Sequence, residues 1–142
     1  MHAKVIETWS YHNGRRAVTK HLATDVDQVE AIVRQLDRQR NPILFLWPSE
    51  DRASHMLDEF SERLEVLGGD GLFWVAGAFS GFFQRRLLNR LGGNEEVEIY
   101  GFEIEQGFGA AEKHVCRDVE VVVRAARYYA QFGLFDPSLV WE

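Results

Sequence analysis

The single thiol of the sequence lies two residues from a histidine, and this pair is the first candidate for chemistry. The two residues are His114 and Cys116. A neighbouring imidazole can lower the pKa of a thiol and make it nucleophilic, and residues two apart on a strand share a face. Cys116 also stands at the entry to an apolar helical pattern, where a buried cysteine usually packs as a small apolar side chain. A small cytosolic enzyme or ligand-binding domain using His114 and Cys116 is therefore the alternative to a protein that only binds a partner.

Other residue types that build active sites are present without the spacing that such sites need. The five histidines show neither the i, i+4 pairing nor the close Cys/His spacing of zinc sites. The glycines form no phosphate loop, and no Gly-x-Ser-x-Gly occurs. Paired glutamates act as acid and base only where burial separates their pKa values, and a dense run of them is more often a solvated face. We predict that the chain is not an enzyme and has no catalytic residues, metal or cofactor.

Glutamates are concentrated between Gly92 and Glu112, a stretch that holds six of them and no lysine or arginine. Charged and apolar side chains alternate there as they do on a half-buried strand. Like charges at this density repel one another, which is easier to understand if a basic protein binds them; ordinary solvation of the surface is the other interpretation. The predicted partner-binding residues, including one aromatic anchor next to a glycine, are Glu95, Glu96, Glu98, Glu103, Glu105 and Phe108.

Composition narrows the classes of protein further. The formal net charge is −6. A polyanion would approach against that field, so we do not expect nucleic acid as a partner. With 142 residues, 46% of them hydrophobic, the chain can bury a core as one domain. The single cysteine, the lack of a secretion signal and the short apolar stretches predict a soluble cytoplasmic protein that does not cross a membrane.

Turn residues and hydrophobic spacing divide the chain into strand-like and helix-like segments. Asn13-Gly14 favours a tight β-hairpin near the amino terminus. The expected strands cover Val5 to Tyr11, Ala17 to Leu22, Ile43 to Trp47, Leu72 to Ala76, Phe79 to Leu88 and Val97 to Ile104. The expected helices cover Thr24 to Gln39, Ser49 to Leu67 and Asp118 to Phe132. The sequence therefore predicts a single α+β domain over residues 1–142, with a mainly antiparallel sheet and about three helices largely on one face.

The end of the chain carries the most distinctive pattern. An amphipathic helical stretch from Asp118 closes with Phe132-Gly133, and Pro137 then precedes Leu139-Val140-Trp141. This pattern resembles the end of a bacterial immunity-protein family of polymorphic toxin systems, the first-numbered immunity family. Members of that family typically close with an amphipathic helix ending in an aromatic residue and glycine, followed by a short tail that carries tryptophan.

The resemblance implies a stoichiometric inhibitor. Such proteins bind and block a cognate toxin, commonly a nuclease or deaminase domain, and have no catalytic residues to carry over. We therefore predict an immunity protein that covers the active site of a basic toxin domain with its glutamates. Trp141 would be structural, with its ring covering the last helix, and Tyr129 belongs to the apolar stripe of that helix. A homo-oligomer is a third possibility, because exposed strand edges and aromatic side chains can pair with themselves.

Overall fold

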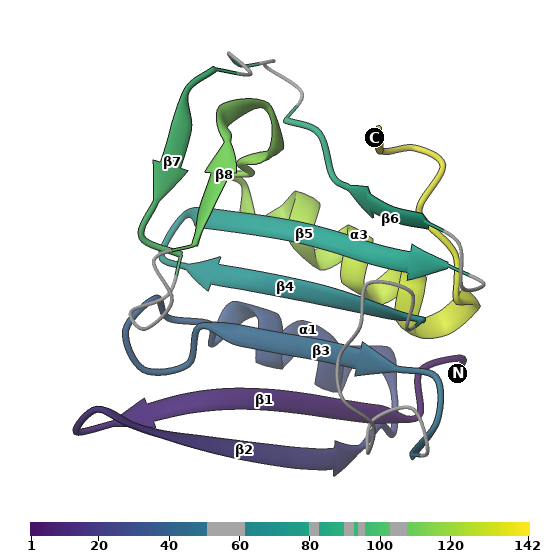
Figure 1. Cartoon of the computed structure of the whole chain (residues 1–142). Coiled ribbons are helices and arrows are strands. Elements are labelled where there is room, and N and C mark those ends of the chain that lie inside the picture. Colours follow the sequence, from purple (N-terminus) through teal and green to yellow (C-terminus); the bar gives the residue numbers. More distant parts are fainter. Residues whose placement is uncertain (51–61, 80–82, 90–92, 94–95, 103–107) are drawn as a thin grey trace.

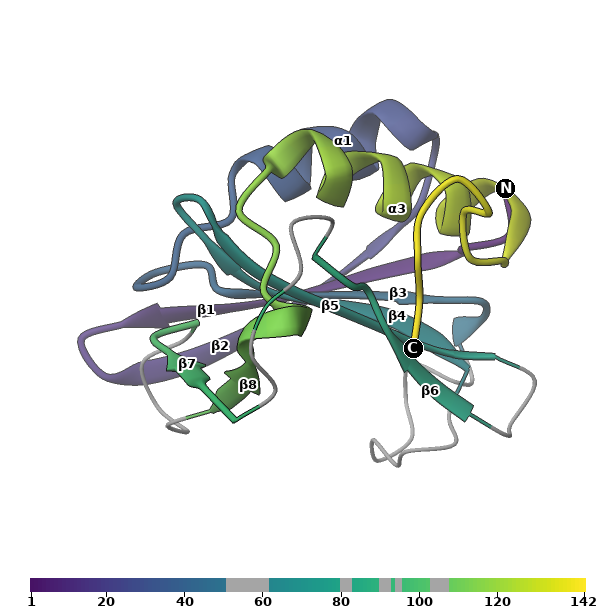
Figure 2. The ribbon, with the colours of Figure 1, turned by 90° about the horizontal axis from the view of Figure 1, so that it is seen from above.

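An antiparallel sheet of six strands, in the order β2-β1-β3-β4-β5-β6, forms the centre of the molecule in the computed structural model (Figure 1). The structure describes residues 1–50, 62–79, 83–89, 93, 96–102 and 108–142. The six strands are β1 (Val5–His12), β2 (Arg15–Leu22), β3 (Ile43–Trp47), β4 (Arg63–Gly69), β5 (Leu72–Phe79) and β6 (Phe83–Arg86). Two helices, α1 (Val26–Arg34) and α3 (Val119–Phe132), pack on one face of the sheet (Figure 2). The α+β class and the mainly antiparallel sheet are thus confirmed.

The first hairpin forms where the sequence predicts it. Asn13 and Gly14 adopt positive φ angles of 51° and 75°, which the tight turns between antiparallel strands require. The register runs from Val5 opposite Leu22 to His12 beside the turn. All eight residues of β2 are exposed, and β2 is the outer strand of the sheet. One edge of the sheet therefore faces solvent along its whole length.

Both helices begin at an aspartate whose side chain accepts a backbone N–H. Asp25 accepts from the backbone of Gln28 at 2.8 Å, so α1 is capped by Asp25, one residue after the expected start at Thr24. α1 also ends before Gln39, because Asp37 accepts the backbone N–H groups of Gln39 and Arg40 and turns the chain. The last helix matches its prediction: Asp118 caps α3 and Gly133, at φ 69°, ends it.

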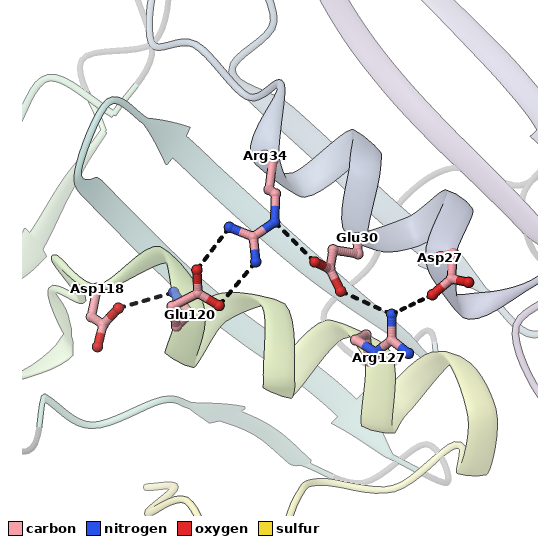
Figure 3. A network of polar contacts seen from close by, with 6 residues as sticks. All are labelled: Asp27, Glu30, Arg34, Asp118, Glu120 and Arg127. Atoms are coloured by element: carbon pink, nitrogen blue, oxygen red, sulfur yellow. Dashed lines mark hydrogen bonds and ion pairs between the residues drawn. The ribbon is translucent and has the colours of Figure 1, made fainter.

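A network of charged side chains joins the two helices across their outer surface (Figure 3). The guanidinium of Arg34 in α1 makes two parallel hydrogen bonds to Glu120 in α3, at 2.8 and 2.9 Å, and Arg34 also donates to Glu30 at 2.9 Å. Arg127 in α3 donates to Asp27 and Glu30 of α1. The two carboxylates raise the pKa of Arg34, and Arg34 lowers the pKa of Glu120. We call these five residues the helix clamp.

The core between helices and sheet follows the period-two alternation of the strands. Leu44 and Leu46 of β3, Leu64 and Val66 of β4 and Val75 of β5 are each fully buried on this side. The helices add a second set of buried residues, which comprises Val29, Val33, Val122, Ala126, Tyr129 and Ala130. This core packs α1 and α3 against one face of the sheet. The opposite face carries no helix among the described residues (Figure 2).

The predicted helix from Ser49 to Leu67 is wrong at its carboxyl end. Residues 63–69 form β4, and the segment 51–61 lies outside the described residues. Leu64 and Leu67 fit a helical stripe, but Leu64 and Val66 face the helices while Arg63 and Glu65 are buried on the other side of the sheet. Because Arg63 and Glu65 are charged although they are buried, the sequence of this segment does not show the alternation that is typical of a strand. Within the described part of the chain there are two α-helices and a short 3₁₀ turn, Glu112–His114, in place of about three helices.

β5 continues through Gly77, where the sequence suggests a hairpin turn. Gly77 pairs with Leu64 on one side and Arg85 on the other. A Cβ at this position would lie 2.4 Å from the ring of Phe135, so the glycine makes room for that ring against the sheet. The connection to β6 falls in residues 80–82, outside the described residues.

A second, two-stranded sheet lies on the side of the main sheet that faces away from the helices (Figure 2). Its strands are β7 (Glu98–Tyr100) and β8 (Gly109–Ala111). The predicted strand from Val97 to Ile104 is shorter in the structure, ending at Tyr100, and its residues 103 and 104 are outside the described part. Neither helix in the described residues is long and apolar enough to cross a membrane.

Candidate functional site

The helix-free face of the sheet carries two cross-strand rows of side chains. In the first row, Trp9, Ile43, Leu67 and Trp74 lie opposite one another on β1, β3, β4 and β5. In the second row, the order from β1 to β6 is Glu7, Phe45, Glu65, Ala76 and Arg86. We call the first set the aromatic row, after its two tryptophans, and the second the charged row, after its two glutamates and arginine. The two rows lie side by side on one surface, because each strand alternates in phase with its neighbours.

Most members of these rows line a pocket of about 510 Å³, which β8 and the 3₁₀ turn border. Its aromatic wall consists of Trp9, Phe45, Trp74 and Phe108. The rings of Trp74 and Phe108 meet edge to face with centroids 4.9 Å apart, and those of Trp9 and Phe45 are 5.6 Å apart. A hollow of this size with an aromatic lining and a few polar groups has the usual character of a ligand pocket.

Glu65 provides a carboxylate at the bottom of the pocket. It is 9% exposed and accepts hydrogen bonds from Arg63 Nε at 3.3 Å and Gln84 Nε2 at 3.2 Å. Burial raises the pKa of Glu65, and the charges of Arg63 and Arg86 counteract part of that rise. Arg63 is itself 3% exposed, so the two residues form a buried ion pair.

Arg86 occupies the same row as Glu65, with the small side chain of Ala76 between them. Its backbone is fixed by two hydrogen bonds of 2.9 Å with Glu142 at the chain end. Its side chain lines the pocket and makes no hydrogen bond or ion pair with another described residue. Its positive charge lowers the pKa of both Glu65 and His114. Within the described part of the chain, the guanidinium of this lining residue therefore has no acceptor that occupies its donors.

A second buried carboxylate, Glu7, stands at the start of the charged row. It is 5% exposed and accepts a hydrogen bond from Trp9 Nε1 at 2.6 Å, and Lys20 lies 3.9 Å away. This bond fixes the indole of Trp9 at the pocket edge, while Arg16 stacks over the same ring at 4.5 Å. The period-two spacing of Glu7 and Trp9 could have indicated a shared face, but a lone glutamate in a strand is ordinarily assigned to solvent.

His114 and Cys116 lie on different sides of the main sheet. His114 lines the pocket, and its Nε2 is 3.2 Å from Glu142. Burial lowers the pKa of His114 despite that carboxylate, which favours the neutral imidazole. Cys116 belongs to the helix-side core and donates to the carbonyl oxygen of Asp118 at 3.4 Å. Activation of the thiol by His114 would require both side chains on the same side of the sheet, and they lie on opposite sides.

The acidic run is described only in part. Glu96 and Glu98 are exposed, and Glu98 accepts a hydrogen bond from the Tyr100 hydroxyl, which raises the pKa of Tyr100. Glu95, Glu103 and Glu105 lie outside the described residues.

Next to these glutamates, Val97 and Tyr100 are 40% and 58% exposed. Phe108, the expected aromatic anchor, instead lies partly buried against Trp74 and Phe102 in the pocket wall. Tyr100 is thus the exposed aromatic residue of this surface, which we call the β7 surface and define as Glu96, Val97, Glu98 and Tyr100.

The two residues with expected structural roles lie on the helix side. Tyr129 is 1% exposed in the helix-side core, and burial raises the pKa of its hydroxyl. Trp141 packs partly buried against Phe135, with ring centroids 4.6 Å apart, and donates from Nε1 to the carbonyl oxygen of Asp136 at 3.2 Å. In the described residues, no group of three or more histidine, cysteine or acidic side chains converges to hold a metal.

No family model and no curated protein matches the chain. A solved structure of similar fold is a hypothetical protein from Neisseria gonorrhoeae, with a TM-score of 0.52 and 12% sequence identity over 96% of this chain and 95% of that one. This similarity extends over the full length of both chains and supports the α+β architecture alone.

Proposed function

We propose that the chain is an immunity protein that binds and neutralises a cognate toxin domain, a basic nuclease or deaminase, by covering its active site. The observation that carries this proposal is the β7 surface. Glu96 and Glu98 are exposed there beside Tyr100, and the strand lies outside the main sheet on its helix-free side (Figure 2). Tyrosine is among the residues that most often anchor protein interfaces, and carboxylates around it steer a basic partner.

Two further features support the proposal. The part of the chain that contains β7 carries the acidic excess, because residues 43–142 have 17 acidic against 9 basic side chains. The resemblance at the end of the chain is the second support, and its residues form a capped α3 that ends at Gly133 and a tail that carries Trp141. An enzyme using His114 and Cys116 has weaker support, because the thiol is buried in the helix-side core.

The test uses a secreted toxin domain encoded next to this chain, purified and immobilised. The double variant Glu96→Lys, Glu98→Lys is expected to slow association about tenfold at low salt, because the steering charge is reversed. Added salt should narrow the difference as the charges are screened. Surface plasmon resonance at two salt concentrations measures both effects.

The matched control is Glu50→Lys, an exposed acidic position three residues after β3 that lines the same open hollow as Lys4 and Leu22. It changes the net charge in the same direction and should leave association nearly unchanged. An association rate that falls equally in both variants would assign the effect to total charge and remove the β7 surface from the proposal.

A further inference from the structure

We propose that the pocket on the helix-free face binds a small planar anion, an aromatic ring that carries a carboxylate or phosphate group. This site is separate from the β7 surface and goes beyond toxin binding. The proposal rests on the lining of the pocket, whose two halves differ in chemistry: one is aromatic, and the other presents a guanidinium.

The aromatic half suits a flat apolar body. Trp9, Phe45 and Trp74 project from three strands of one sheet, and Phe108 closes the wall from the start of β8. Their edge-to-face contacts fix the rings in place, so little side-chain entropy is lost when a ligand enters. The volume of about 510 Å³ lies within the range of about 300–1,000 Å³ that is usual for small-molecule sites.

The charges of the polar half favour an anion. The carboxylate of Glu65 is paired with Arg63, and that of Glu142 is paired with Lys113 at 2.6 Å. Besides Glu65, the charged lining residue in the described part of the chain is Arg86, whose guanidinium has no acceptor among the described residues. A planar guanidinium binds carboxylate and phosphate through two parallel hydrogen bonds.

Arg86 lies at the end of the charged row, two strands away from Glu65. Ala76 separates Glu65 from Arg86 in the charged row, and strands are about 4.8 Å apart, so the two backbones are about 10 Å apart. Ala76 itself is fully buried and does not line the pocket, so it contributes only the spacing between the two charges. A cationic ligand would instead meet Arg86 at one end, and at the other it would meet Arg16, which already covers the ring of Trp9.

A ligand series on the unmodified chain tests the charge and the ring separately. Isothermal titration compares indole-3-acetate with tryptamine, which has the same ring and the opposite charge, and with acetate, which has no ring. We expect indole-3-acetate to bind at least tenfold more tightly than either. Adenosine monophosphate against adenosine gives the phosphate arm, and the tighter of the two anions identifies the acid group. Equal binding of tryptamine, or no binding of either anion at millimolar concentration, overturns the proposal.

The position of the ligand is read from the indole N–H signals in an NMR spectrum. The signals of Trp9 and Trp74 should shift on titration, whereas those of Trp47 and Trp141, which are not among the lining residues, should not. Shifts confined to Trp47 or Trp141 would place the ligand elsewhere and reject this site.

Arg86→Gln should weaken binding of the anion at least tenfold and leave the weak binding of tryptamine unchanged or stronger. The matched control is Arg85→Gln, the exposed neighbour on β6 whose side chain alternates to the opposite face. Wild-type affinity in Arg86→Gln, or an equal loss in Arg85→Gln, contradicts the assignment. The ligand series needs no variant, so it decides the question even if Arg86→Gln does not fold.

Discussion

At the scale of single residues, the pair formed by Glu65 and Arg63 is the most unusual feature of the sheet. Both side chains are almost fully buried, on a face that no described helix covers. Such a pair loses solvation from both charges, and the mutual attraction offsets only part of that cost. The raised pKa of Glu65 indicates that desolvation outweighs the attraction of Arg63 and Arg86.

This imbalance predicts a pH dependence of stability. The folded chain holds the Glu65 proton more tightly than the unfolded chain, so folded-state stability falls as the pH rises from the ordinary value of 4.5 through the raised pKa. Glu65→Gln removes this titration. The free energy of unfolding of the wild type, relative to that of Glu65→Gln, should therefore be larger at pH 4 than at pH 7.

Denaturation by urea at the two pH values measures the difference, provided that both proteins unfold in two states. Arg63 is present in both proteins, so the comparison reports the titration of Glu65 alone. A relative stability that does not change with pH would mean that Glu65 ionises as easily in the folded chain as in the unfolded one.

Trp141 gives a prediction about packing. Trp141→Ala should lower the free energy of unfolding by about 2–3 kcal/mol, because a partly buried indole and its contact with Phe135 are lost. Val140→Ala is the control, since Val140 is 59% exposed and should change stability little. Thermal unfolding followed by circular dichroism compares the two. A melting temperature unchanged in Trp141→Ala would argue against a structural role for the ring.

At the scale of elements, the helix clamp is a surface feature that links α1 to α3 (Figure 3). Arg34→Ala should lower the melting temperature at low salt, because the bidentate contact with Glu120 and the bond to Glu30 are both lost. The loss should shrink in concentrated salt, since these side chains are solvated. Arg15→Ala, an exposed arginine on β2, is the control for the loss of one positive charge. A loss that did not depend on salt would assign the effect of Arg34 to packing.

The elements differ in how far their sequences determine them. The first hairpin and α3 follow from local signals, Asn13-Gly14 in one and a capped apolar stripe in the other. β4 does not, because its buried face carries Arg63 and Glu65, and charged residues at alternate positions are read as solvent-facing. The spacing of the leucines in this segment fits a helix as well as a strand. The segment is a strand because it pairs with β3 and β5, which its own sequence does not reveal.

The candidate sites could be predicted only where they are local. Glu96 and Glu98 are exposed as their own charge predicts. The pocket could not be predicted, because Trp9, Trp74 and Arg86 come from three strands and meet only through cross-strand register. His114 and Cys116 show the opposite case: they are close in sequence, yet the chain places them on two sides of the sheet.

At the scale of the whole molecule, the two faces of the sheet have separate roles. The helix-covered face contains the largest apolar core, and the other face carries both the pocket and the β7 surface. β8 is common to the last two, since it pairs with β7 and borders the pocket. The proposed toxin binding and the proposed anion binding can therefore be tested on different residues, Glu98 for the first and Arg86 for the second.

The two edges of the main sheet set a limit on how copies of the chain can polymerise. At the β6 edge, the carboxyl-terminal tail already occupies backbone groups of Arg86 and Leu88, while β2 at the other edge leaves a whole strand open. Two molecules that paired through their β2 strands would form a closed, twofold dimer. A third molecule would then have to pair at a β6 edge, where the carboxyl-terminal tail already lies. Arg15, Arg16 and Lys20 on β2 also repel a second copy. A strand added at β6 would therefore have to displace the tail from Arg86 and Leu88, and one added at β2 would meet three basic side chains.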